Sequence, residues 1–150
     1  MRIRDIRQIH ELLSAMELSK FTREVRKAVR KNYISTLAVV REFEQFCEQI
    51  SPKCYQGISC AEEGIRLNAE LLSADDTRAE EIRKILSDER FSAYNEAYAE
   101  LMELLNEELD KDVVIEWATA SEEEWMDSLS AAGVQYSAKM LDEIIYMISE

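Results

Sequence analysis

The sequence predicts a mainly all-α protein, folded as a single helical domain over residues 1–150, with one small β element. Only three glycines and one proline occur in 150 residues, which is little turn chemistry for a many-stranded sandwich or barrel. Apolar residues recur at helical spacing along most of the chain. We therefore expect an antiparallel pair of long helices with short flanking helices around one core.

The first long helix is predicted over Glu17–Ile50, after a short helix over residues 3–16. Its apolar or small residues step by three or four positions, so they stay on one face for about seven turns. They are Val25, Val29, Tyr33, Thr36, Val40, Phe43, Cys47 and Ile50. Because proline has no amide hydrogen and restricts the preceding residue, Ser51–Pro52 should end this helix before a loop over residues 53–59.

The second long helix should begin at Asp88 or Glu89, after a weaker helix over residues 60–72 and a short one opened by the capping box of Thr77 and Glu80. Its apolar residues also step by three or four positions, so the helix can pack antiparallel on the first. They are Phe91, Tyr94, Tyr98, Leu101, Leu105 and Leu109.

The C-terminal part differs in composition. Residues 112–118 are rich in β-branched and aromatic side chains, which is typical of a short strand or an extended covering segment. Ser121 and Glu124 form a second capping box, and Gly133 should close the helix that follows. Ser137 then caps a final helix.

The sequence offers little for catalysis. It lacks a glycine-rich phosphate loop, a GxSxG nucleophile motif and an HExxH zinc motif, and His10 is its only histidine. Cys47, Cys54 and Cys60 are odd in number, and their spacing fits neither a disulfide framework nor a zinc site. We therefore expect no enzyme activity, no cofactor and no metal site.

Negative charge is concentrated in the second half of the chain. The net charge is −13, and residues 70–127 alone carry nineteen acidic and five basic side chains. Within this block five carboxylates step by three or four positions on the face of the second long helix opposite its apolar row. They are Glu96, Glu100, Glu103, Glu107 and Asp110.

Two interpretations of these carboxylates stay open. They can form a solvated face that keeps a small protein in solution. They can also form an anionic surface that binds a basic groove by imitating the spacing of a phosphate backbone. Glu122, Glu123 and Trp125 would extend such a surface, because an aromatic beside acids can anchor an interface, although core packing also explains the tryptophan.

A basic cluster lies on the first long helix, formed by Lys20, Arg23, Lys27, Arg30 and Lys31. Direct binding of nucleic acid is opposed by the overall charge and by the lack of a recognition-helix motif. Pairing with acidic residues, in the same molecule or in a symmetric partner, is the favoured use of this cluster. A homodimer is therefore one expected arrangement.

Four segments in this order resemble small, mostly helical proteins encoded by phages and prophages. They are LSKFTREVRKAVRKNYISTLAVVREFEQF, ELMELLNEEL, DVVIEW and YSAKMLDEIIYMI. The resemblance covers roughly residues 1–50 and 93–148 and brings no site residues with it, because that family has no established activity. It implies a viral or mobile-element protein that acts in a bacterial host cell.

The sequence predicts no membrane-spanning segment and no signal peptide, so we expect a soluble protein in the host cytoplasm. The predicted function is non-catalytic: the carboxylate-rich helix face binds a basic surface of a host protein, with inhibition of a nucleic-acid-processing or defence enzyme as one result. The alternative is a structural or assembly component of a phage or mobile element that self-associates.

Overall fold

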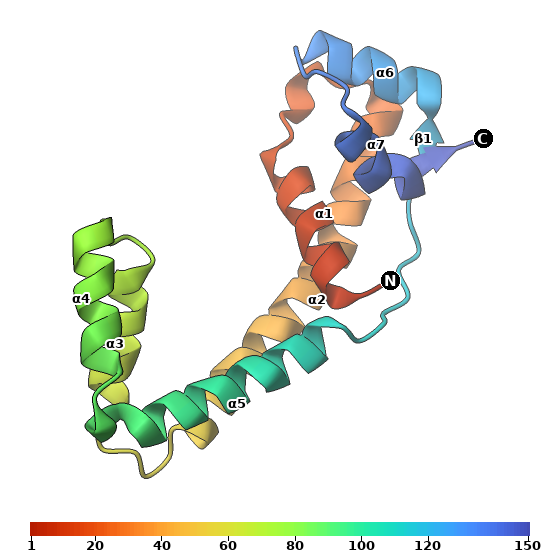
Figure 1. Ribbon diagram of the computed structural model, residues 1–150. Helices are drawn as coiled ribbons and strands as arrows, with labels where there is room; N and C mark the ends of the chain where they lie inside the picture. Colours follow the sequence, from red (N-terminus) through yellow and green to blue (C-terminus); the bar gives the residue numbers. More distant parts are fainter. The chain divides into compact units, whose positions relative to one another are not determined.

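The computed structural model describes all 150 residues and confirms a mainly α-helical protein, with 74% of residues in helices and one two-stranded sheet. The chain forms two compact units (Figure 1). Unit 1 contains residues 1–44 and 108–150, and unit 2 contains residues 45–107. The single domain expected over residues 1–150 stays a prediction, and each unit is described by itself below.

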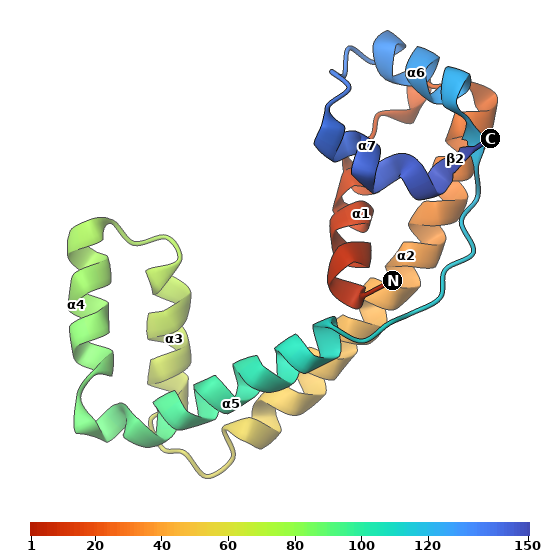
Figure 2. The same ribbon diagram turned by 45° about the vertical axis from the view of Figure 1, so that its right-hand side comes forward.

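Unit 1 begins with α1 alongside the N-terminal part of α2, and α6 and α7 pack with them (Figures 1 and 2). Its elements are α1 (Ile3–Ala15), the 3-10 helix η1 (Leu18–Lys20), the first part of α2 (Arg23–Cys54), β1 (Ala120–Ser121), α6 (Glu122–Ala131), α7 (Ala138–Ile144), the 3-10 helix η3 (Ile145–Met147) and β2 (Ile148–Ser149). The two short strands pair in parallel.

The core of unit 1 draws side chains from both ends of the chain. Val25 of α2, Trp125 of α6, Ile144 of α7 and Met147 of η3 have no exposed surface, and Leu13 of α1 packs with them. Burial of such apolar side chains contributes about 1.5–3 kcal/mol each relative to exposure. Residues more than 100 positions apart therefore share one core.

Helix α2 starts later and ends later than the sequence predicts. The residues expected as its first turn form η1, and α2 itself begins at Arg23. Thr22 precedes it, and its hydroxyl accepts a hydrogen bond from the amide of Val25 at 3.4 Å. At the other end α2 continues through Pro52 to Cys54, so the predicted stop is wrong. A proline in the last turn deprives only one carbonyl of its helical donor, and the helix ends two residues later in any case.

The buried face of α2 is centred slightly differently from the predicted one. Val25, Val29, Thr36 and Phe43 are buried as predicted, but 37% of the Tyr33 surface is exposed. In its place the neighbouring Asn32 is completely buried. A polar side chain is not expected in a core unless it finds hydrogen-bond partners.

Asn32 finds those partners in the extended segment before β1. Its amide nitrogen donates to the carbonyl of Ala118, and its side-chain oxygen accepts from the amide of Ala118, both at 2.8 Å. The β element expected over 112–118 accordingly consists of an isolated bridge between Arg2 and Asp112 and of strand β1 just beyond the range. Residues 113–119 belong to no helix or strand.

Unit 2 contains the C-terminal part of α2, then α3 (Ala61–Leu71), α4 (Asp76–Leu86), the 3-10 helix η2 (Glu89–Phe91) and α5 (Ser92–Leu109). Helices α3 and α4 form an antiparallel hairpin, and α5 runs antiparallel to the end of α2 as predicted (Figures 1 and 2). Leu67, Ile82, Phe91 and Tyr94 form the buried cluster of this unit.

Gly64 lies where α3 meets the ring of Tyr94. A Cβ atom at this position would stand 2.7 Å from three atoms of that ring, closer than real contacts allow. The glycine that weakens the helical pattern of α3 in the sequence is therefore required by packing in unit 2.

Most of the predicted helix caps are confirmed. Ser121 accepts from the amide of Glu124 at 3.3 Å, Ser137 accepts from Met140 at 3.1 Å, and Gly133 has a positive φ of 71°. The capping box of Thr77 is wrong, because the helix begins two residues earlier, at Asp76, and its cap Asp75 accepts from the amide of Arg78 at 2.8 Å. None of the helices combines the length and the apolar composition needed to cross a bilayer.

Candidate interaction surface

Four of the predicted carboxylates form an exposed row on α5 of unit 2. Glu96, Glu100, Glu103 and Glu107 are all exposed, and none of them makes an ion pair. We call these four residues the acid row. Residues three and four apart on a helix stand about 5–6 Å from each other, and α5 contains no Lys or Arg that could offset the repulsion.

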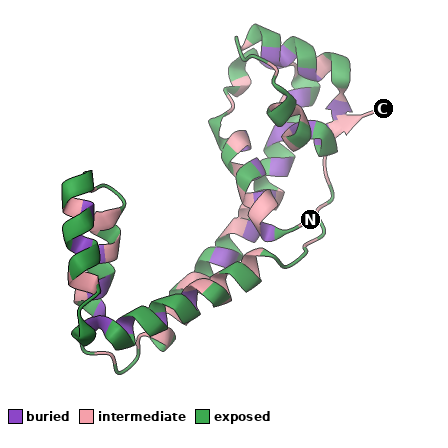
Figure 3. Cartoon of the chain, viewed as in Figure 1, coloured by how far each residue is buried: buried purple, intermediate pink, exposed green.

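The opposite face of α5 fixes the direction of the acid row. Tyr94, Ala97 and Leu101 are buried, whereas the outer surface of the helix is exposed (Figure 3). The ring of Tyr94 stacks on Tyr55 with 5.4 Å between centroids, and its hydroxyl is hydrogen-bonded to the side-chain amide of Asn68. Side chains locked in this way hold the helix by its inner face, so the carboxylates point outward from a fixed support.

Tyr55, whose ring stacks on Tyr94 of α5, is uncharged near neutral pH. Burial raises the pKa of Tyr55 well above its usual range, and the nearby Tyr94 adds to this shift. The Tyr55 ring therefore serves packing.

Asp110 does not belong to the acid row. Helix α5 ends at Leu109, and the Asp110 carboxylate accepts from Nε of Arg4 at 2.9 Å, with Arg2 at 3.9 Å. Arg2 and Arg4 lie next to Asp110 because the first residues of the chain pair with residues 111–113. The amide of Val113 donates to the carbonyl of Met1 at 2.8 Å. The fifth carboxylate predicted from the spacing is thus compensated within unit 1.

The residues predicted around α6 separate into two groups. Glu122 and Glu123 are exposed in the first turn of the helix, where carboxylates interact favourably with the helix dipole. Trp125 is completely buried and donates its indole N–H to the carbonyl of Met147 at 2.9 Å. Its predicted role as an interface anchor is wrong, because the indole fills the core of unit 1.

The basic cluster is exposed and has no partner within the chain. Lys20, Arg23, Lys27, Arg30 and Lys31 all face solvent, and none makes an ion pair. Pairing with acids of the same molecule, one of the two uses predicted for it, is therefore not found. The positive charge remains available to another molecule.

An apolar groove adjoins part of this cluster in unit 1. It measures about 410 Å³ and lies between the end of α1, η1 and α2. Its walls are built by Leu13, Met16, Leu18, Val29, Tyr33 and Ile34, with Arg30 as the only charged lining residue. The helical spacing did not predict this groove, because it placed Tyr33 on the buried face of the helix. The signal was Ile34, a large apolar residue that does not fit the predicted buried face.

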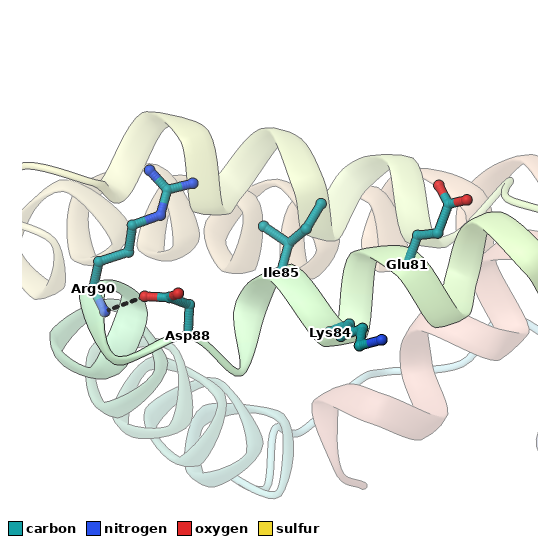
Figure 4. A pocket seen from close by; sticks show the side chains of 5 residues that line it. All are labelled: Glu81, Lys84, Ile85, Asp88 and Arg90. Carbon is teal, nitrogen blue, oxygen red and sulfur yellow. Dashed lines mark hydrogen bonds between the residues drawn. The ribbon is translucent and has the colours of Figure 1, made fainter.

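A shallow hollow of about 440 Å³ lies at the end of α4 (Figure 4). Three of its four charged side chains already have structural partners. Asp88 accepts from the backbone amide of Arg90 at 3.0 Å, and the Arg90 guanidinium contacts Glu63 at 3.0 Å. Glu81 is paired with Arg78 at 3.2 Å. Nothing in this hollow couples a nucleophile to a base.

His10 is occupied in the packing of unit 1. Its ring stacks on Tyr33 at 4.8 Å between centroids, and Nδ1 lies 2.9 Å from the hydroxyl oxygen of Thr36. Burial lowers the pKa of His10, and the negative charges of Glu11 and Glu44 partly offset this. No disulfide joins the three cysteines, and no group of three or more His, Cys, Asp or Glu residues is placed to hold a metal ion.

Comparison of the chain with family models, with curated proteins and with solved structures finds no match.

Proposed function

We propose that this protein is a non-catalytic interaction protein whose acid row binds a basic surface of another protein. The observation that supports the proposal is the row itself: four exposed carboxylates without ion pairs, held one turn apart on a helix with a buried inner face. Unpaired like charges at this spacing cost a few tenths of a kcal/mol each in a helix. A basic partner would remove that cost.

The acid row also suits recognition of a surface that normally binds nucleic acid. Carboxylates about 5–6 Å apart resemble successive phosphates, and a lysine- or arginine-lined groove would gain from them by long-range steering. We propose a host nucleic-acid-processing or defence enzyme as the partner, and inhibition as the result. The resemblance to phage-encoded proteins supports this context.

The test is charge reversal on α5. The triple variant E100K/E103K/E107K should lose at least 100-fold in affinity for a partner captured from bacterial lysate and then purified. The control is E48K/E62K/E80K, which changes the charge by the same amount at exposed positions of unit 2 outside the acid row. Circular dichroism checks that both variants remain folded.

Salt provides the second readout. Calorimetric titrations at 50 and 300 mM salt should show weaker binding at the higher concentration for the native protein, because surface charges are screened. Affinity that is unchanged by the reversal, or insensitive to salt, would remove the acid row from the interface.

A second candidate function is self-association as an assembly component. It is favoured by the coexistence of an unpaired basic cluster on η1 and α2 and an unpaired acid row on α5, since opposite charges on two copies attract. Sedimentation at low and high salt distinguishes the two functions. A large oligomer supports assembly, and its dissociation at high salt would assign the contact to these charges, whereas a monomer or small dimer at both concentrations supports the binding protein.

A further inference from the structure

The apolar groove of unit 1 exposes side chains that a folded protein usually covers. Ile34 has 67% of its surface exposed and Tyr33 has 37%, and both line the groove. The floor is firm, because Leu13 and Val29 are only 3% and 2% exposed and belong to the core of unit 1. An exposed apolar surface above a packed floor is typical of a binding site.

The groove runs beside one stretch of α2, which supplies Val29, Arg30, Tyr33 and Ile34. The last turn of α1, Met16 and Leu18 of η1 line its other side. Amphipathic helices bind such surfaces by placing apolar side chains at positions i, i+3, i+4 and i+7 into the groove. Tyr33 stacks on His10 at one side, which holds this aromatic wall in place.

Positive charge lies along the α2 wall. Arg30 lines the groove, and Arg23, Arg26 and Lys27 precede it by seven, four and three residues, so they share its side of the helix. None of these four residues makes an ion pair. A segment that fills the groove would therefore gain from acidic residues next to its apolar ones.

We propose that this groove binds an acidic, amphipathic helix of a partner protein. The site is separate from the proposed function, since it lies in unit 1 and selects the opposite sign of charge. A second copy of this chain is a poorer occupant through its acid row. The exposed face of α5 presents glutamates with small residues and only Tyr98 as a large side chain, too little apolar surface to fill the groove.

The experiment uses a fluorescein-labelled peptide of about 16 residues with leucine at helical spacing and glutamate at the flanking positions. Fluorescence anisotropy against the full-length protein should show saturable binding at 50 mM salt, weaker at 300 mM. A peptide with lysine in place of glutamate, and one with serine in place of leucine, should each bind at least tenfold more weakly.

Two surface variants locate the binding site. Ile34→Ser should weaken binding at least tenfold, and Arg30→Glu at least fivefold with a smaller dependence on salt. Val114→Ser and Lys139→Glu make the same chemical changes at exposed positions of unit 1 outside the groove, and should bind like the native protein. Amide chemical shifts of α1 and α2 should move on titration.

Several outcomes would overturn the proposal. One is equal binding of the glutamate and lysine peptides, and another is unchanged affinity in the Ile34→Ser variant. Sedimentation gives a third: a dimer of the native protein that dissociates in Ile34→Ser would assign the groove to a second copy. The E100K/E103K/E107K variant should bind the peptide normally, so failure of the acid-row proposal and failure of this one are distinguishable.

Discussion

Unit 1 joins residues that lie far apart in the chain, whereas unit 2 is built from neighbours. The bonds between Asn32 and Ala118 span 86 positions, and that from Thr22 to Ser128 spans 106. In unit 2 the side-chain hydrogen bonds span at most 30 positions, as from the Cys60 thiol to the Arg90 carbonyl. Unit 1 therefore depends on an apolar core and a few polar contacts between distant residues, and unit 2 on local helix packing.

The two units also differ in charge. Unit 2 carries six basic and fourteen acidic side chains, whereas unit 1 carries twelve basic and seventeen acidic ones. The acid row lies in unit 2, and the basic cluster with its groove lies in unit 1. One chain thus carries a negatively charged surface and a positively charged surface. The net charge alone does not reveal the positive one.

The largest effect is expected from removing the polar contact that closes unit 1. Asn32→Ala leaves the partly buried amide and carbonyl of Ala118 without their side-chain partner, which should lower the free energy of unfolding by about 2–4 kcal/mol. Urea unfolding measures this change. Ser35→Ala removes an exposed bond from the same helix and should cost less than about 0.5 kcal/mol.

Hydrogen exchange on the Asn32→Ala variant tests whether unit 1 and unit 2 are stabilised independently of each other. Protection should fall in unit 1, around residues 113–119, and persist in α3 and α4. Equal loss of protection in both units would contradict the proposed difference between them. It would show that the two units unfold together, which is the behaviour expected of a single domain.

A smaller effect is expected from the local packing of unit 2. Alanine normally stabilises a helix by about 0.8–1 kcal/mol relative to glycine. At position 64 the added methyl group meets the Tyr94 ring, so Gly64→Ala should instead destabilise by about 1–3 kcal/mol. In a Tyr94→Ala background the same substitution should cost nothing or stabilise. Thermal unfolding of the native protein, the two single variants and the double variant measures the coupling energy between positions 64 and 94. If the two changes in stability simply add, the contact between these positions is contradicted.

The smallest effect concerns pH and is confined to unit 1, which contains the only histidine. Burial holds the pKa of His10 below its unfolded value of 6.5, so the unfolded chain binds a proton more readily. Stability should therefore fall as pH decreases from about 6.5 toward the folded pKa, and be fully present above 6.5. Urea midpoints of the native protein and of His10→Gln at pH 6 and 7.5 measure this. The same pH dependence in both would exclude His10 as the source.

Helical periodicity predicted the fold class, both long helices, the caps at Ser121 and Ser137, and the outward direction of the acid row. These features depend on residues a few positions apart, which a sequence displays directly. The exchange of Tyr33 for Asn32 on the buried face could not be predicted, because the partner of Asn32 is the backbone of Ala118, and backbone groups carry no signature in the sequence.

Long-range pairing explains the two errors at the predicted site. Asp110 follows the helical spacing perfectly, yet Arg4 neutralises it from the other end of unit 1. Trp125 stands beside three glutamates, yet its indole donates into the core. Spacing describes one element at a time and says nothing about which element lies opposite.

The pair of hydrogen bonds made by Asn32 restricts what evolution can place at this position. The side chain acts as a substitute peptide group, accepting and donating within one plane. Aspartate has no hydrogen to give, glutamine is one methylene too long, and serine cannot reach both atoms at once. A saturation library selected for folded protein should therefore return asparagine almost alone at residue 32, while adjacent solvent-facing sites tolerate many replacements.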